Sequence, residues 1–157
     1  MAHEMVLGTV NEEDVMPAVR DLLEAEFFMQ DVSVMVLEGS RSPAAVGAPA
    51  GLLGEAFGLF EGIETFFLPG LGPLRADGDL LALFLEAPTQ AAEKGFAAIL
   101  SIWGVSEEEG ARFEKKIQEG QILVAVKVEN EQRRSDAGEI FRRYGGSKGS
   151  FGETFAA

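Results

Sequence analysis

Residues 106–128 read SEEEGARFEKKIQEGQILVAVKV, and this stretch decides the fold. Ser106 is followed three residues later by Glu109, which is the capping-box pattern that begins a helix. The helix is expected to run to about Glu119, and Gly120 ends it because glycine closes a helix in the left-handed conformation without steric cost. Residues 121–128 are rich in Val, Ile and Leu and predict a strand. The last third of the chain therefore contains a helix followed by a strand.

Another helix follows this unit. Asn130 is a good N-cap residue, and it predicts a helix over 131–144. The apolar anchors of this helix are Ile140, Phe141 and Tyr144, and the glycines that follow end it.

The tail, residues 146–157, combines a Gly- and Ser-rich run with two aromatic residues, Phe151 and Phe155. Their separation of four residues places them on one face of either a helix or a strand. The tail is therefore either disordered or an added edge strand. Burying two Phe side chains contributes roughly 3–6 kcal/mol, and ordering about seven residues costs a comparable amount. We expect the tail to dock between chains rather than onto its own domain.

Upstream of the decisive stretch, two β-prone runs flank an amphipathic segment. Residues 5–10 (MVLGTV) and 32–37 (VSVMVL) predict strands. Asn11 is the expected N-cap of a helix over 12–27, in which apolar residues recur at helical spacing. Pro17 lies late for the first turn of that helix, so an irregular start is expected.

Residues 40–104 differ in amino-acid composition from the rest of the chain. Gly47, Gly51, Gly54 and Gly58 are spaced four, three and four apart, so on a helix they form one face without side chains. Such a face allows two helices to approach closely. We therefore predict an apolar, Gly-rich helical insertion.

The second half of this insertion contains one strong turn signal. Residues 68–74 read LPGLGPL, which is typical of a turn. Residues 79–86 predict a short helix, and residues 88–103 predict a second one that contains Trp103, expected to be a core anchor.

The predicted order is strand, helix, strand, insertion, helix, strand, helix, with a possible strand in the tail. That order suits an α+β fold with a ferredoxin-like framework, in which helices cover one face of an antiparallel sheet. We expect one domain over 1–157, with the framework at 5–39 and 105–145, the insertion at 40–104 and the tail at 146–157.

Composition excludes several classes of function. The net charge of −13, from 13 Lys and Arg against 26 Asp and Glu, disfavours binding to nucleic acid and to anionic lipid. The chain has no cysteine, so disulfides, thiolate metal sites and a Cys nucleophile are excluded. No uncharged apolar stretch of about 18 residues predicts a transmembrane span. Peripheral membrane contact is disfavoured, and the expected location is the cytoplasm.

Several segments together resemble one bacterial family. They are the VLGTV of residues 6–10, the LPGLGPL of 68–74, the WGVSEEE of 103–109, Phe113 with Glu114, and the GQILVAV of 120–126. In these segments the chain is similar to the general stress protein family, also described as heat-induced stress proteins. The resemblance implies a ferredoxin-like framework around a Gly- and Ala-rich helical insertion, and it implies no catalytic residues.

The chain departs from that family at two places. Glu55, Glu61 and Glu64, together with several Phe residues, interrupt the insertion, which favours a packed or oligomeric role over a membrane role. The tail, residues 146–157, has no counterpart in the family pattern.

No set of residues predicts catalysis. The only histidine is His3, near the terminus, which is a poor position for a general base. Glu55, Glu61 and Glu64 could bind a hard cation, but carboxylate metal sites in helical proteins commonly include His. We therefore expect these acids to lie on the solvent-exposed edge of an amphipathic helix and to bind no metal. No cofactor is expected.

Two functional hypotheses remain. The first is a non-catalytic, stress-related interaction or scaffold protein that forms a homo-oligomer, or docks into a larger protein complex, through its insertion. The second is a binding module for a small apolar ligand or lipid. The candidate interface residues are Gly51, Gly54, Gly58, Phe57, Phe60, Phe66, Phe67, Phe151 and Phe155.

Overall fold

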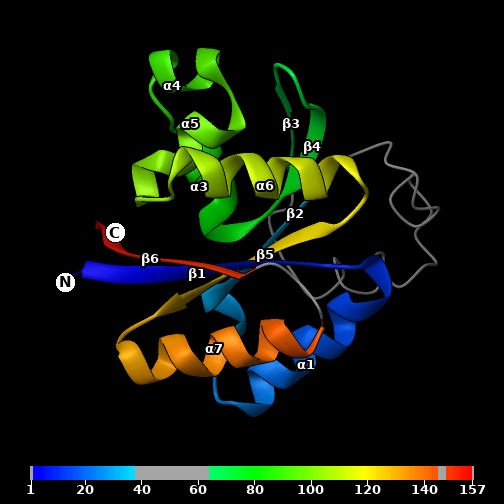
Figure 1. Ribbon diagram of the computed structural model, residues 1–157, viewed down its shortest axis with the longest axis vertical. Helices are drawn as coiled ribbons and strands as arrows, with labels where there is room; N and C mark the ends of the chain where they lie inside the picture. Colours follow the sequence, from blue (N-terminus) through cyan, green and yellow to red (C-terminus); the bar gives the residue numbers. More distant parts are fainter. Residues whose placement is uncertain (1, 38–63, 145–147, 157) are drawn as a thin grey trace.

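The computed structural model describes residues 2–37, 64–144 and 148–156; for residues 2–4, 12, 64 and 148–156 it describes the backbone alone. The described residues form a mixed α+β structure built on one six-stranded sheet, with strand order β3-β4-β2-β5-β1-β6 (Figure 1). All neighbouring strands are antiparallel. The strands are β1 (Ala2–Val10), β2 (Val32–Leu37), β3 (Glu64–Leu68), β4 (Gly72–Ala76), β5 (Ile122–Val128) and β6 (Lys148–Ala156). The α+β class expected from the sequence is confirmed.

Two β-α-β units interleave in the centre of the sheet. β5 lies between β1 and β2 and is antiparallel to both, so β1 and β2 run in the same direction and are joined by α1 (Val15–Glu24). β1 in turn lies between β5 and β6, which are joined by α7 (Glu131–Arg143). Both helices cover the same face of the sheet, where Val6, Leu22 and Phe141 are among the buried residues of one core cluster.

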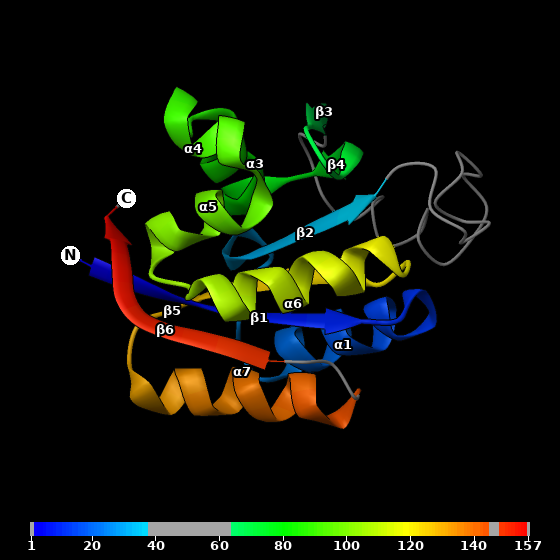
Figure 2. The same cartoon turned by 45° about the horizontal axis from the view of Figure 1, so that its top comes forward.

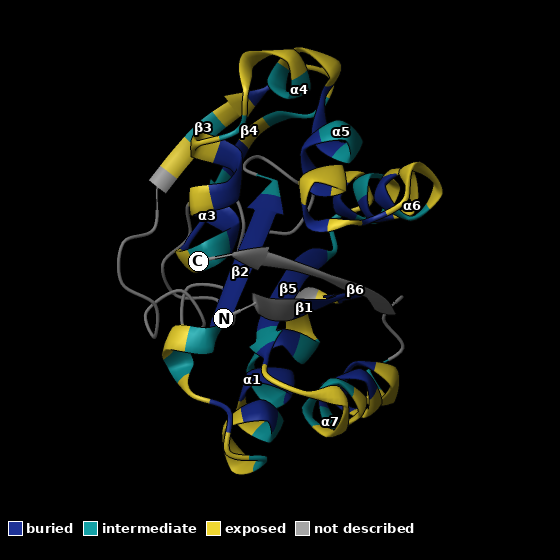
Figure 3. Cartoon of the chain, turned by 90° about the vertical axis from the view of Figure 1, so that its left-hand side faces the viewer, coloured by how far each residue is buried: buried dark blue, intermediate teal, exposed yellow. Residues whose placement is uncertain are grey.

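The opposite face of the sheet is covered by described helices of residues 78–118. These helices are α3 (Gly78–Leu85), α4 (Thr89–Lys94), α5 (Phe96–Leu100) and α6 (Glu107–Gln118). Trp103, Phe113 and Leu123 belong to the second core cluster, which fills the space between these helices and the sheet. The sheet therefore separates two apolar cores, and the buried strands β2 and β5 run between the two helical layers (Figure 3).

Two of the three caps expected from the sequence are confirmed, and the cap at Asn11 is wrong: α1 begins after Asp14, and Asn11 Oδ1 accepts a hydrogen bond from Gln121 Nε2 at 3.2 Å instead. Ser106 Oγ accepts a hydrogen bond from the Glu109 N–H at 3.2 Å, and Asn130 Oδ1 accepts one from the Arg133 N–H at 2.9 Å. Gly120 has φ of +98°, the conformation that favours glycine at the end of a helix.

The helix predicted over 12–27 is shorter than expected. A 3-10 turn occupies Glu12–Asp14, and α1 begins at Val15. Pro17 therefore lies in the first turn of α1, where a backbone N–H has no partner within the helix and its absence costs little. The irregular start follows from this position of the proline.

The predicted helical insertion is wrong in one described part. Residues 64–76 form the antiparallel hairpin β3–β4, in which the predicted turn at 68–74 holds Gly70 and Gly72 at φ of +87° and +108°. The helix predicted over 88–103 is divided at Gly95, whose φ is +111°, into α4 and α5. Residues 38–63 lie outside the described residues, and with them the predicted glycine-faced helix.

The prediction that the tail docks between chains is also wrong. β6 pairs with β1 of its own chain, with Ala2 opposite Ala156 and Met5 opposite Phe151, so both ends of the described chain lie side by side (Figure 2). Without β6, β1 would be an edge strand with a row of unpaired backbone groups. β6 pairs with those backbone groups, and this is the physical reason why the tail forms an added edge strand, the other alternative expected from the sequence.

Candidate functional site

The structure places the predicted interface residues in three separate regions. Gly51, Gly54, Gly58, Phe57 and Phe60 lie outside the described residues. Phe151 and Phe155 lie in β6, where the backbone alone is described. Phe66 and Phe67 lie in β3, and their side chains are described.

Phe66 and Phe67 point to opposite faces of the hairpin, as neighbours on a strand must. Phe66 is half-buried against the second core cluster, with its ring centroid 5.8 Å from that of Phe84. Phe67 is 70% exposed, the highest value among the large hydrophobic residues of the described chain. One of these two predicted interface residues therefore belongs to the core, and the other is free for contact.

β3 is an edge strand among the described residues. It pairs with β4 on one side, with Phe66 opposite Leu74 and Phe67 opposite Pro73, and no described strand lies on its other side. Among the described residues, the backbone N–H and C=O groups on that side of β3 therefore have no strand partner.

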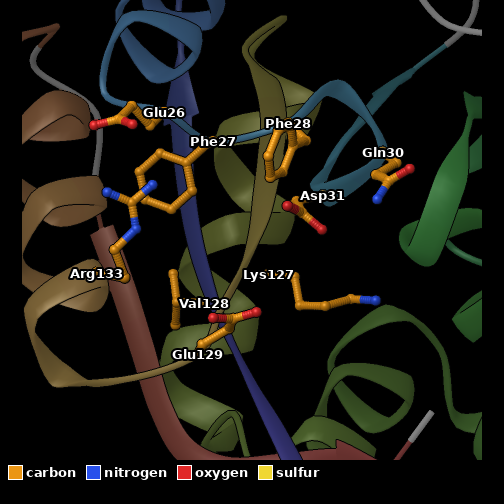
Figure 4. Close-up of a pocket in the computed structure, with 9 residues that line it drawn as sticks. All are labelled: Glu26, Phe27, Phe28, Gln30, Asp31, Lys127, Val128, Glu129 and Arg133. Atoms are coloured by element: carbon orange, nitrogen blue, oxygen red, sulfur yellow. The ribbon is translucent and has the colours of Figure 1, made fainter.

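A pocket of about 260 Å³ lies at another corner of the molecule, between the α1–β2 and β5–α7 connections (Figure 4). Two neighbouring aromatic residues line it. Phe27 is buried, whereas Phe28 is 67% exposed. Glu26, just before them, is the one described non-glycine residue with a positive φ, +73°.

The two cations that line this pocket already have partners. The Arg133 guanidinium lies 3.8 Å from the centroid of the Phe27 ring, and its Nη1 donates to the Ala25 carbonyl at 2.8 Å. The Lys127 ammonium lies 3.6 Å from Asp79 Oδ2.

Unlike the two cations, the carboxylates that line the pocket have no ion-pair partner among the described residues. Glu26, Asp31 and Glu129 line it, and none of the three forms an ion pair within the part of the chain that the structure describes. The uncompensated charge of the pocket is therefore negative.

Asp77 is a buried carboxyl at a different place, between β4 and α3. It is 3% exposed, and its Oδ1 accepts a hydrogen bond from the Val34 N–H of β2 at 2.8 Å. Burial raises the pKa of the Asp77 carboxyl from 3.8 to about 6, against the smaller effect of this hydrogen bond. Ser33, the residue before Val34, is also buried, and its hydroxyl makes no hydrogen bond with any described residue. The hydrogen bonds between Asp77 and the Val34 backbone join the start of α3 to β2.

The unique aromatic residues have structural positions. Trp103 is buried in the second core cluster, as expected. Tyr144 donates a hydrogen bond from its hydroxyl to Asp21 Oδ2 at 2.6 Å, and this bond is the main reason why the pKa of Tyr144 rises to about 12. Arg143 Nη1 lies 3.2 Å from the same oxygen, so this cluster joins the end of α7 to α1.

The sequence predicted neither this pocket nor Asp77. Asp77 carries no distinctive sequence signal, since its burial depends on the pairing of β4 with β2. The one signal for the pocket was the Glu26-Phe27-Phe28 run, in which two large aromatic residues directly follow a helix.

Metal-binding geometry is absent from residues 2–37, 64–144 and 148–156, in which no group of three or more His, Asp or Glu side chains could hold an ion. Of the acids considered above as metal ligands, Glu55 and Glu61 lie outside these ranges, and the side chain of Glu64 is not described. The side chain of His3, the only histidine, is not described either. No described helix is both long and apolar enough to cross a bilayer.

Comparison of the chain with protein-family models, with curated proteins and with solved structures gave no match. The assignment of function therefore depends on the residues of this chain alone.

Proposed function

We propose that the protein is a non-catalytic interaction module that self-associates through the β3 edge of its insertion. The observation that carries this proposal is the exposed side chain of Phe67 on a strand whose outer edge has no described partner. Large exposed apolar side chains beside an open strand edge commonly mark contact surfaces.

The residues of β3 favour pairing with another strand. Natural edge strands are commonly protected by Lys, Pro or a bulge, whereas β3 reads ETFFL, with neither Lys nor Pro and with its one charged residue, Glu64, at its start. The register of β3 with β4 shows no bulge. Two β3 strands related by a two-fold axis would pair antiparallel, so that each satisfies the open edge of the other. A second copy of this chain is therefore the proposed occupant.

The proposal includes the nature of the framework. The order β2-β5-β1-β6, with α1 and α7 on one face, supports a ferredoxin-like framework that is extended by the hairpin β3–β4 beside β2. The general stress protein family, the role in stress and the cytoplasmic location remain predictions from the sequence.

The alternative hypothesis, a site for a small apolar ligand or lipid, has less support. The described corner pocket is lined largely by charged side chains, whereas sites for such ligands are predominantly apolar. Self-association is the function that the described geometry favours.

Sedimentation velocity of Phe67→Lys tests the proposal. We expect the unmodified protein to dimerise as concentration rises, and Phe67→Lys to remain a monomer because a lysine blocks the edge. Phe28→Lys is the matched control, since Phe28 is exposed to nearly the same extent, 67% against 70%, and should still dimerise.

Two outcomes would contradict the proposal. An unmodified protein that stays monomeric at every concentration has no self-association to explain. Equal dimerisation of Phe67→Lys and Phe28→Lys, with circular dichroism showing both folded, would place the contact elsewhere than β3.

A further inference from the structure

The corner pocket has the size of a site for one side chain. Its volume of about 260 Å³ lies below the range of about 300–1,000 Å³ that is common for pockets holding whole small molecules. Three segments form it: the α1–β2 connection, the end of β5 and the start of α7. An occupant therefore inserts one extended group rather than a large ring system.

The charge of this group follows from the lining. Arg133 and Lys127 are engaged with the Ala25 carbonyl and with Asp79, whereas Asp31 and Glu129 have no ion pair with described residues. An anion would meet two cations that already pair with carboxylates, Arg133 with Asp136 at 3.5 Å and Lys127 with Asp79 at 3.6 Å, and it would approach free carboxylates. A cation would meet free carboxylates instead, and a chain with a net charge of −13 attracts basic partners over long range.

The neighbouring aromatic residues Phe27 and Phe28 also favour a cationic occupant. Arg133 already lies over the Phe27 ring at 3.8 Å, so this corner contains one guanidinium on an aromatic face. Phe28, the next residue, offers a second ring that is 67% exposed, and no cation of the described chain lies over it. A cation over an exposed ring is attracted by the negative face of the π-system.

We propose that this pocket binds the side chain of an arginine or lysine residue presented by a basic segment of a partner protein. The aliphatic stem lies against Phe28, and the charged group lies between Asp31 and Glu129. Lys127 and Arg133 are positioning residues, because they hold the walls of the pocket through their own bonds to Asp79 and Ala25.

Nuclear magnetic resonance titration of the full chain tests this assignment with three probes. Acetyl-arginine amide carries the proposed group, acetyl-citrulline amide has nearly the same shape without the charge, and inorganic phosphate tests for an anion site. We expect acetyl-arginine amide to shift amide signals of residues 26–31 and 127–129, and the other two probes to leave them in place.

Variants then identify the groups that bind. The double variant Asp31→Asn, Glu129→Gln is expected to weaken binding of acetyl-arginine amide about tenfold, because the free carboxylates are removed. Phe28→Ala is expected to weaken it about two- to fivefold, the effect of an exposed cation–π contact. Leu85→Ala is the control and should bind normally, since this side chain is also exposed, at 54%, but lies in α3, away from both proposed contacts.

Several results would overturn the assignment. No shift at tens of millimolar acetyl-arginine amide, equal shifts with acetyl-citrulline amide, or binding of phosphate in its place would each do so. Unchanged affinity in the double variant, with its spectrum showing a folded chain, would also overturn it. None of these results bears on self-association, which is measured by mass.

Discussion

Replacing Asp77 with asparagine should make the protein more stable at neutral pH. Asp77 is 3% exposed, and its Oδ1 accepts a hydrogen bond from the Val34 N–H at 2.8 Å. Asparagine has nearly the same shape and keeps an oxygen that can accept this bond, but it cannot ionise. The Asp77→Asn variant therefore isolates the cost of burying the charged form of the carboxyl.

The size of the effect follows from the pKa of Asp77. Burial raises this pKa from 3.8 to about 6, a difference of about 2 units, and each unit corresponds to about 1.4 kcal/mol. Because the folded-state pKa is the higher one, the folded chain keeps its proton after the unfolded chain has lost it. Stability is therefore lost as the pH rises from about 4 to about 6, with a total loss of about 3 kcal/mol above that window.

Urea denaturation measured from about pH 4 to about pH 7.5 gives the free energy of unfolding across this window. We expect the advantage of Asp77→Asn over the unmodified protein to grow by about 2–3 kcal/mol between these two values. Asp79→Asn is the control. Its side chain is partly exposed and pairs with Lys127, so its difference from the unmodified protein should change by less than about 1 kcal/mol. A difference for Asp77→Asn that stays constant over the whole range would refute the reasoning, because burial would then not penalise the carboxylate.

Three further substitutions test the backbone and the two cores by denaturation. Glu26→Gly should raise the free energy of unfolding by about 1 kcal/mol, since φ of +73° is costly for every residue with a Cβ; a loss of stability would reveal a stabilising contact of this side chain. Gly8→Ala should lower it by about 1–3 kcal/mol, because the added Cβ would lie 2.6 Å from Phe141 Cγ; an unchanged melting temperature would show that the ring moves freely. Ser33→Ala should leave it unchanged or raise it by about 1 kcal/mol, because the buried hydroxyl has no described partner; a clear loss would indicate an unseen hydrogen bond.

Features that depend on neighbours in sequence were predicted well. The caps at Ser106 and Asn130 each act on a backbone N–H three residues later, so no knowledge of the tertiary structure is needed to recognise them. The strand predicted over 32–37 has the bounds of β2, and the strand over 121–128 differs from β5 by one residue.

Features that depend on distant partners were not predicted. The short apolar runs of the hairpin β3–β4 fit a helix or a strand equally well, and the pairing of β4 with β2 decides between them. A close helix contact through glycine was predicted for residues 51–58, whereas the structure shows one at Gly110, where an added Cβ would lie 2.9 Å from that of Ala97. The contact needs both α5 and α6 in place, so spacing within one helix does not reveal it.

The corner pocket also depends on residues that are distant in sequence, so the sequence did not predict it. Arg133 donates to the carbonyl of Ala25, a residue 108 positions away in the chain. The pocket therefore exists only once α7 has packed beside α1 on the sheet. The net charge of −13 indicated only that nucleic acid and anionic lipid are disfavoured as partners, and it carried no information about where a pocket lies.

The two proposed contacts lie at opposite ends of β2 and can act together. Asp31 directly precedes β2 at the pocket, whereas Phe67 lies opposite Pro73, beyond the Leu37–Leu74 pair at the other end. Six residues of extended strand separate the two ends by about 20 Å. Pairing of two chains at β3 would therefore leave both pockets open, so that one assembly presents two sites for basic side chains. A partner segment with two basic residues at the matching distance would bind such an assembly far more tightly than a single residue does, because its second contact forms at a high effective concentration.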